Sequence, residues 1–165
     1  GTFAQVAENA EVLILAVKGD AAESAMALLP AAAIDNKIVI DTNNPIANTA
    51  PVNGVLQYFT NANESLMERL QNAFPKTRFV KAFNSVGNAC MINPKTDVQP
   101  TMFICGNDAD AKSTVSTLLE AAGWEVADFG MVESARAIEH LCMLWCIPGF
   151  LNNQWWHVFK LVQVK

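Results

Sequence analysis

The sequence is short of basic residues and of long apolar runs. Lysine and arginine together number 11, against 16 aspartates and glutamates, which gives a formal net charge of −5 and a pI near 4.9. A surface that follows nucleic-acid phosphates needs clustered lysine and arginine, so no nucleic-acid partner is expected. The densest apolar run, 141–150, is interrupted by Pro148-Gly149, and the sequence therefore predicts no membrane span.

Several motifs of common enzymes are also absent. The chain contains no Gly-x-Gly-x-x-Gly turn, P-loop, Gly-x-Ser-x-Gly or His-Glu-x-x-His motif. Its four cysteines lack Cys-x-x-Cys spacing, and we interpret them as reduced thiols of a cytoplasmic protein. Cys142 and Cys146 lie one helical turn apart, but two thiolates alone make a poor zinc site, so no metal is expected. His140 and His157 are interpreted as structural or solvated.

What the chain does have is an alternation of strand-like and helix-like segments over a length typical of one domain, 1–165. Apolar residues make up 52% of it. Strands are expected at 11–17, 37–41, 78–83, 101–106 and 125–129, and helices at 21–29, 64–73, 108–122 and from 133 onward. This order predicts an α/β fold, with a Rossmann-like parallel sheet of five strands covered by helices on both faces.

The C-terminal part, from about 131 to 165, is expected to be helical. Pro148 and Gly149 should kink or end the helix there, and Asn152 or Asn153 could cap a last segment that contains the two adjacent tryptophans.

Polar residues follow two of the predicted strands directly. The segments 38–45 (IVIDTNNP) and 79–87 (FVKAFNSVG) each read as a buried strand that stops in polar side chains. In open α/β sheets, ligands bind at the carboxyl ends of parallel strands. These two strand ends therefore predict a binding site.

The polar residues of these strand ends have two interpretations each. Asn43 and Asn44 offer amide donors and acceptors that could hold a carboxamide or a flavin edge, or they could serve the turn before Pro45. Lys81 lies within an apolar strand and needs a partner, because an unpaired buried ammonium is costly. That partner could be an internal carboxylate such as Asp41, or a cofactor phosphate or substrate ring.

Taken together, 41–45 (DTNNP) and 81–87 (KAFNSVG) resemble one family closely. They are similar to the dinucleotide-binding fold of NADPH-dependent coenzyme F420 reductases and their relatives, including the cytosolic domain of the STEAP metalloreductases. The resemblance extends along nearly the whole chain, from 10–17 to 159–161. It implies an oxidoreductase that moves hydride between NADP(H) and a deazaflavin or flavin-like acceptor, with coenzyme F420, FAD or FMN as possible second cofactors.

The same resemblance places small residues at the end of the first strand against the ribose and nicotinamide. No catalytic residue is assigned, because hydride transfer between two stacked cofactors needs little from protein acids and bases. Lys18 stands where the family commonly has proline. The expected cofactor-binding residues are Ala16, Val17, Lys18, Asn43, Asn44, Pro45, Lys81, Ala82, Phe83 and Asn84.

The resemblance further implies that roughly 50 to 60 residues, two βα units, precede Gly1 in the complete form of the family. Such a segment would carry the Gly-rich turn that holds the pyrophosphate. We therefore expect the N-terminal βα units to be missing and NADPH binding by this chain to be weak.

Two other functions remain open at this point. The chain could be a non-catalytic, dinucleotide-binding regulatory or scaffold protein of the same fold, or a generic flavodoxin-like domain whose similarity is fortuitous.

The aromatic residues of the C-terminal part predict a homodimer contact, because large apolar patches are seldom exposed on monomers. The residues expected at that contact are Leu144, Trp145, Phe150, Trp155 and Trp156.

Overall fold

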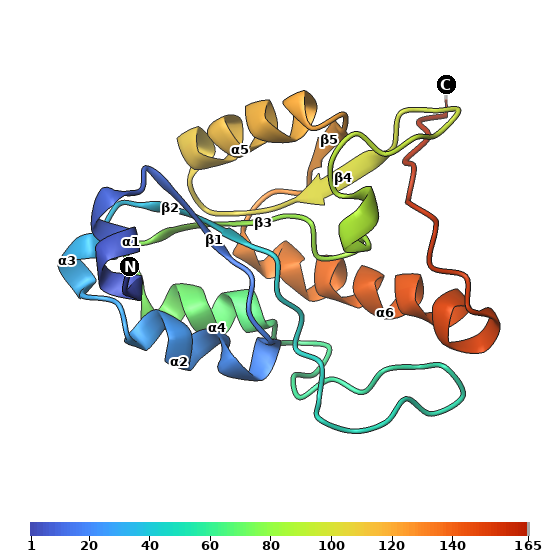
Figure 1. Cartoon of the computed structure of the whole chain (residues 1–165), viewed down its shortest axis with the longest axis horizontal. Helices are drawn as coiled ribbons and strands as arrows, with labels where there is room; N and C mark the ends of the chain where they lie inside the picture. The colour runs from blue at the N-terminus through green and yellow to red at the C-terminus, as the bar shows by residue number, and fades with distance from the viewer. Residues whose placement is uncertain (165) are drawn as a thin grey trace.

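The computed structural model describes residues 1–164 and has three layers, with strands between two sets of helices (Figure 1). The strands are β1 (Val12–Leu15), β2 (Ile38–Asp41), β3 (Arg78–Lys81), β4 (Thr101–Ile104) and β5 (Glu125–Asp128). The helices are α1 (Phe3–Asn9), α2 (Ala22–Ala27), α3 (Ala31–Ile34), α4 (Leu66–Ala73), α5 (Ala109–Ala121) and α6 (Ala135–Asn152). Short 3₁₀ turns are η1 (Gly19–Ala21), η2 (Asn88–Cys90) and η3 (Val132–Ser134).

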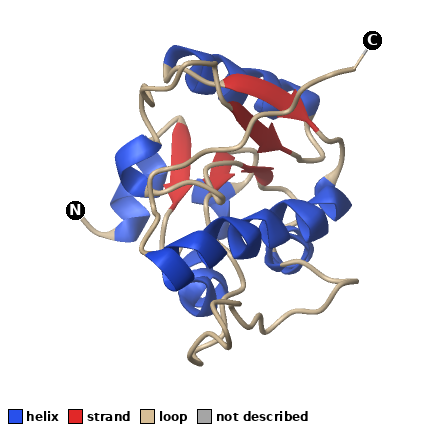
Figure 2. Cartoon of the chain, turned by 90° about the vertical axis from the view of Figure 1, so that its right-hand side faces the viewer, coloured by secondary structure: helices blue, strands red, loops and turns tan. Residues whose placement is uncertain are grey.

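Alternation along the buried strands assigns their side chains to two cores. Val39 and Phe79 lie in the core shared with α1 to α4 and α6, whereas Ile40 and Val80 lie in the core shared with α5. Strands buried on both faces need apolar residues at nearly every position, which explains the continuous apolar runs in the sequence. The predicted α/β fold with parallel strands and helices on both faces is confirmed (Figures 1 and 2).

The predicted single five-stranded parallel sheet is wrong in one respect. Strands β1, β2 and β3 form one parallel sheet, and β4 and β5 form a separate parallel pair. The two meet at an antiparallel bridge, where the Lys81 amide donates to the Cys105 carbonyl at 3.0 Å. The connection from β3 to β4 contains only the short η2 turn, so no crossover helix carries the chain back to the start of the sheet and β4 runs opposite to β3.

The predicted C-terminal helix is present, but it is shorter than expected. It passes through Pro148 and ends at Asn152, because Asn153 adopts a left-handed conformation with φ 55°. Residues 153–164 are not helical; the backbone there bonds to β4 instead, where the Thr101 amide donates to the Phe159 carbonyl at 2.9 Å. Within 131–164, the expected helix is therefore present only up to Asn152, and residue 165 lies outside the described residues.

No helix within 1–164 has the length and apolar character that crossing a membrane would require.

One partly buried carboxylate, that of Glu68, ties α4 to α6. Glu68 closes the capping box at the start of α4 with Ser65, and it also accepts from the Arg136 guanidinium of α6 at 3.0 Å. The hydrogen bond from Arg136 holds the pKa of Glu68 below its usual value, although partial burial opposes this shift. A lowered folded-state pKa means that the bond stabilises the fold above the ordinary carboxyl pKa and is lost as the pH falls through the lowered value.

We therefore expect Glu68→Gln to be less stable than the parent at neutral pH, with the difference narrowing as the pH falls below about 4. Urea unfolding followed by tryptophan fluorescence at several pH values measures this. Glu120→Gln, at an exposed position of α5, controls for removal of one carboxylate from a helix. A stability difference that stayed constant down to pH 3 would contradict the role given to the Glu68 carboxylate.

Candidate functional site

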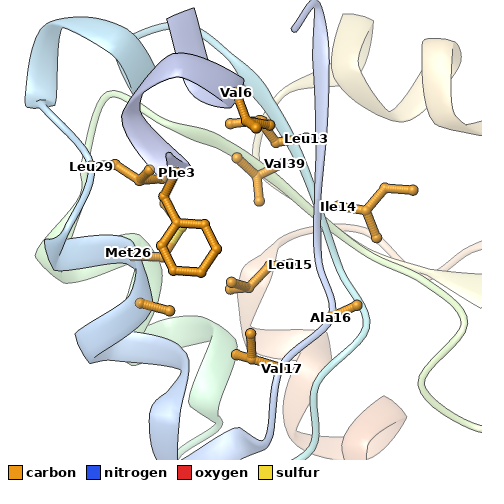
Figure 3. A pocket seen from close by; sticks show the side chains of 11 residues that line it. Phe3, Val6, Leu13, Ile14, Leu15, Ala16, Val17, Met26, Leu29 and Val39 are labelled. Carbon is orange, nitrogen blue, oxygen red and sulfur yellow. The ribbon is translucent and has the colours of Figure 1, made fainter. Parts of the chain in front are cut away.

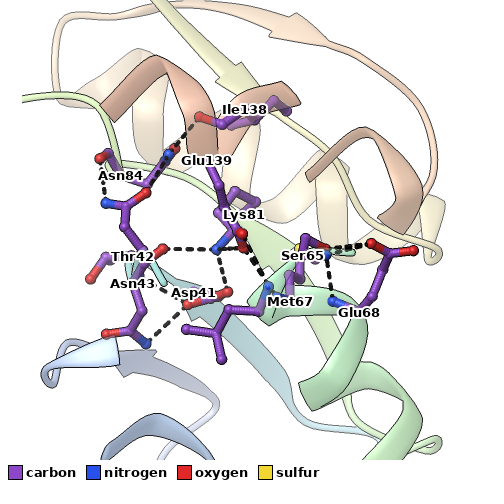
Figure 4. Close-up of polar contacts among 12 residues, drawn as sticks. Asp41, Thr42, Asn43, Ser65, Met67, Glu68, Lys81, Asn84, Ile138 and Glu139 are labelled. Atoms are coloured by element: carbon purple, nitrogen blue, oxygen red, sulfur yellow. Dashed lines mark hydrogen bonds and ion pairs between the residues drawn. The ribbon is translucent and has the colours of Figure 1, made fainter. Parts of the chain in front are cut away.

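The carboxyl ends of β1, β2 and β3 converge, as the sequence predicts. Leu15, Asp41 and Lys81 are in register across the three strands. Beyond them, the Val17 amide donates to Asn43 Oδ1 at 3.2 Å, and Asn44 Nδ2 donates to the Asn84 carbonyl at 2.7 Å. The polar segments that follow each strand thus form one cluster at a single edge of the sheet (Figure 4).

Asn43 is used within the protein. Its side chain is buried, and its Nδ2 donates to the Leu15 carbonyl at 3.1 Å and to Asp41 Oδ1 at 3.0 Å. Together with the bond from Val17, these contacts join the ends of β1 and β2. Asn43 therefore positions the loop at 16–18.

Asn44 and Asn84 form a reciprocal pair across the ends of β2 and β3. Asn84 Nδ2 donates to Asn44 Oδ1 at 3.1 Å and to the Ile138 carbonyl of α6 at 2.8 Å. Because both of these partners are acceptors, the orientation of the Asn84 amide is fixed. Its Oδ1 is buried and has no hydrogen-bond partner within the described residues. A buried acceptor without a partner is uncommon in folded proteins and suits a ligand donor.

Phe83, directly before Asn84, has a strained backbone. Its φ of 60° lies in the left-handed region, which bulky residues rarely adopt. Such a conformation costs on the order of 1–3 kcal/mol and is retained where the surrounding structure requires it. Here it turns the chain out of β3 immediately before Asn84, the residue that contacts α6.

Lys81 lies behind this cluster in a fully buried ion network. Its Nζ donates to Asp41 Oδ2 at 2.6 Å and to the Asn43 carbonyl at 2.9 Å, and it lies 2.9 Å from Glu139 Oε1 (Figure 4). A lysine ammonium has three donors, so all of them have a partner. Burial alone would lower the pKa of Lys81, but the charges of Asp41 and Glu139 outweigh it and the pKa is raised.

Lys81 thus pairs with the internal carboxylate of Asp41, which was one of the two interpretations of the sequence. The ammonium is fully buried, and its three partners are Asp41, the Asn43 carbonyl and Glu139 of α6. Its hydrogen bond to the Asn43 carbonyl holds the backbone of Asn43 in place.

Glu139 completes the network, and sequence reasoning missed it. Its two oxygens accept from the Leu66 and Met67 amides at 3.0 and 3.1 Å, at the first turn of α4. Free amides and the helix dipole make that position favourable for a carboxylate. A signal was available, because Glu139 lies on the same helical face as the buried Ala135 and Cys142.

Ala16, Val17 and Lys18 are exposed at the end of β1. Lys18 is an ordinary surface cation, 3.2 Å from Asp20 Oδ2 and 3.2 Å from Asn48 Oδ1. Ala16 and Val17 border an apolar groove of about 320 Å³ between α1, α2 and β1 (Figure 3). Within the described residues β1 pairs only with β2, so its other edge is unpaired there, and the groove beside it is lined by apolar side chains.

Gly19 is a second residue that the sequence did not single out. A Cβ at this position would lie 1.9 Å from the Asn44 carbonyl oxygen, so only glycine lets η1 approach the strand-end cluster. The remaining expected residues, Pro45 and Ala82, are buried beside the cluster and shape its backbone.

Cys105 and Cys142 are poor candidates for a reactive thiolate near this cluster. Burial raises the pKa of Cys105 to about 12. The hydrogen bond with Cys146, followed by burial, raises the pKa of Cys142. No group of three or more His, Cys, Asp or Glu side chains within 1–164 could hold a metal ion.

Comparison with known proteins agrees with this fold. The family of coenzyme F420-dependent NADP oxidoreductases matches residues 1–45. The resemblance to the F420 reductases is confirmed. The chain is 31% identical over 155 residues to the metalloreductase STEAP3 of Rattus norvegicus, and 30% identical over 112 residues to the F420-dependent NADP reductase of Methanocaldococcus jannaschii.

These matches cover 91% and 67% of the chain, but only 30% and 50% of the two relatives. A crystal structure from Arthrobacter sp. FB24, described as a candidate F420-dependent NADP reductase, superposes with a TM-score of 0.91 at 29% identity. That superposition covers 99% of this chain and 74% of the other.

We expect Lys81→Met to destabilise the fold by about 3–5 kcal/mol, because it leaves two carboxylates buried without their cation. Lys76→Met, which removes an exposed pair with Asp35, is the matched control and should change stability by less than about 0.5 kcal/mol. Urea unfolding at neutral pH compares the two. A loss below about 1 kcal/mol for Lys81→Met would show that the network is not a stabilising element.

Proposed function

We propose that this chain is part of an NADP(H)-dependent oxidoreductase that transfers hydride between the nicotinamide and a deazaflavin or flavin-like acceptor. The names of the matched relatives support NADP(H) as one cofactor and coenzyme F420 as a candidate acceptor. FAD or FMN remains an alternative for the second role. NADPH supplies the hydride when bound, and the protein supplies position, shielding from water and polar anchoring.

The observation that carries this proposal is the unpartnered, buried Oδ1 of Asn84 at the strand-end cluster. An acceptor of this kind fits the amide of a nicotinamide carboxamide, which donates hydrogen bonds and carries no charge. Asn44, the half-buried partner of Asn84, has a second Nδ2 hydrogen for a ring substituent or ribose oxygen. Neither residue adds charge next to the reacting carbon.

The other expected residues have supporting roles in this proposal. Ala16, Val17 and Lys18 provide exposed backbone beside the cluster, where a planar ring could approach closely. Asn43 and Lys81 act as positioning residues, because every side-chain contact they make is internal. Pro45, Ala82 and Phe83 set the path of the two polar segments.

The lysines in and beside this cluster are not available to bind the pyrophosphate or the 2′-phosphate of NADP(H). Lys81 is committed to carboxylates, and Lys18 is paired with Asp20. The cluster therefore fits the nicotinamide end of NADP(H) and not its phosphates.

We also propose that the protein forms a homodimer through α6. Leu144, Phe150 and Leu151 are exposed large apolar residues along this helix and at its end. Of the tryptophans expected at this contact, Trp145 and Trp155 pack within the chain and offer less surface to a partner, whereas Trp156 is 79% exposed. Light scattering at micromolar concentration tests the proposal, and a monomer would refute it.

We expect Asn84→Ala to lower kcat/KM for NADPH with a flavin acceptor by roughly tenfold to hundredfold, equivalent to about 1.4–2.7 kcal/mol. The lost interaction is the acceptor for the nicotinamide amide together with the fixed position of Asn44. His140→Ala is the control and should stay within about threefold of the parent, because its imidazole is exposed, hydrogen-bonds the Arg136 carbonyl and lies against the Tyr58 ring.

The assay is the loss of NADPH absorbance by the full-length protein, with unfolding curves to confirm that both variants fold. Normal kinetics for a folded Asn84→Ala variant would remove Asn84 from the site. NADPH binding without any turnover in the parent would instead favour a regulatory dinucleotide-binding protein.

A further inference from the structure

Two of the four cysteines form a close pair inside α6. Cys142 and Cys146 are one helical turn apart, and their sulfurs lie 4.0 Å from each other. Both side chains are buried, in an apolar cluster that also contains Leu56 and Trp145. The proposed hydride transfer uses neither thiol, so the pair is a nucleophilic group without an assigned role.

The two thiols of this pair differ in character. The hydrogen bond with Cys142 lowers the pKa of Cys146, although burial opposes the shift. Cys146 is also 9% exposed, whereas Cys105 in the core is completely buried, so a water-sized oxidant has access to Cys146 and not to Cys105. A cysteine that forms a thiolate next to a second cysteine is the arrangement found in redox-sensing proteins.

The helix allows the two sulfurs to reach bonding distance at a cost. In a regular α-helix, Cα atoms four residues apart lie about 6 Å from each other, within the range of about 4.4–6.8 Å that disulfides span. The Cβ atoms are about 5–6 Å apart and must approach to about 4 Å, so the turn has to tighten. Pro148 has no amide to donate to the Leu144 carbonyl, which leaves this turn with one hydrogen bond fewer to resist the change.

The turn that contains Cys142 also holds the strand-end cluster in place. The Ile138 carbonyl accepts from Asn84 Nδ2 at 2.8 Å (Figure 4), and in an α-helix the same carbonyl accepts from the amide four residues later. The next carbonyl, that of Glu139, accepts from the Tyr58 hydroxyl at 2.7 Å, and Tyr58 packs against the cysteine pair. Tightening of the turn at Cys142 would therefore shift the carbonyl that fixes the Asn84 amide.

We propose that Cys142 and Cys146 form a reversible disulfide in the presence of hydrogen peroxide, and that this disulfide lowers turnover at the strand-end cluster. Its effect on turnover rests on the proposed function, whereas its formation does not. Because the helical turn must tighten, the disulfide is strained, and strained disulfides are the readily reduced, regulatory ones.

The oxidation proceeds in two steps. The Cys146 thiolate attacks one peroxide oxygen, the O–O bond breaks, and the other oxygen takes the proton released by Cys146 and leaves as water, which gives a sulfenic acid. The Cys142 sulfur then attacks the Cys146 sulfur, the S–O bond breaks, and a second water leaves with the Cys142 proton. Two thiols lose two electrons in total, and peroxide is reduced to two waters. A dithiol reverses the change by thiol–disulfide exchange and is itself oxidised to a disulfide.

The test treats the full-length protein with hydrogen peroxide, removes the excess with catalase and blocks free thiols with N-ethylmaleimide. Trypsin cleavage after Arg136 and Lys160 then releases peptide 137–160, in which Cys142 and Cys146 are the only cysteines. We expect this peptide to be two hydrogens lighter and to carry no maleimide. NADPH oxidation with a flavin acceptor should fall by about tenfold, because the Asn84 amide is displaced. Dithiothreitol should restore both the mass and the turnover.

Two variants and a control assign the chemistry to this pair. Cys146→Ala should keep its turnover after the same treatment, because the thiolate is gone. In Cys142→Ala the sulfenic acid of Cys146 has no second thiol, so dimedone should trap it. Cys90→Ala, which removes the partly exposed cysteine outside the pair, is the matched control and should respond to peroxide as the parent does. Unfolding curves confirm that the variants fold, and the mass measurement on the parent needs no variant.

Three outcomes would contradict the proposal in different ways. If peptide 137–160 of the treated parent carries two maleimides, no disulfide forms, and the proposal is wrong while the proposed function stands. If the disulfide forms and turnover does not fall, the pair has no regulatory effect and its thiols are packing residues. If the reduced parent never oxidises NADPH, the proposed function fails together with the effect on turnover, and the mass of the peptide still decides whether the disulfide forms.

Discussion

The buried ammonium of Lys81 is the group on which most of this structure depends. It joins β2, β3 and α6 through Asp41 and Glu139, and Glu139 in turn accepts from the first amides of α4. Burying three charges is expensive unless each is fully hydrogen-bonded, and here each has several partners. The network therefore fixes the relative position of the strands and two helices, because moving any one of them would leave a charge without a partner.

This network and the candidate site lie next to each other at the same strand ends. On the inner side, charges are paired and buried. On the outer side, Asn44 and Asn84 provide neutral amides. Placing the charge behind the site and amides in front provides a rigid base without adding a strong field where hydride would move.

A strained backbone conformation and a close approach between two backbone segments add a second constraint at the strand-end cluster. The left-handed backbone of Phe83 and the contact of Gly19 with the Asn44 carbonyl both lie within the cluster. Neither feature benefits packing in an obvious way. Conformations that cost free energy tend to persist where function requires a defined geometry, and this agrees with the assignment of the strand ends as the site.

The sequence by itself determined the strands, most helices and the location of the candidate site. Continuous apolar runs identify strands buried on both faces, and the change to Asp-Thr-Asn-Asn-Pro and Lys-Ala-Phe-Asn marks their carboxyl ends. These signals are local, because each depends only on residues next to one another in the chain. The sequence also required a partner for Lys81, since an unpaired buried charge is costly, but it left open whether that partner was Asp41 or a ligand.

Only the tertiary structure decided the remaining features. The direction of β4, the partner Glu139 and the return of residues 153–164 along β4 all depend on contacts between segments far apart in the sequence. The same is true of the unpartnered oxygen of Asn84, because whether an amide is satisfied depends on every group around it. Local patterns specify which residues are buried, whereas the choice of partner is made by the packing of the whole chain.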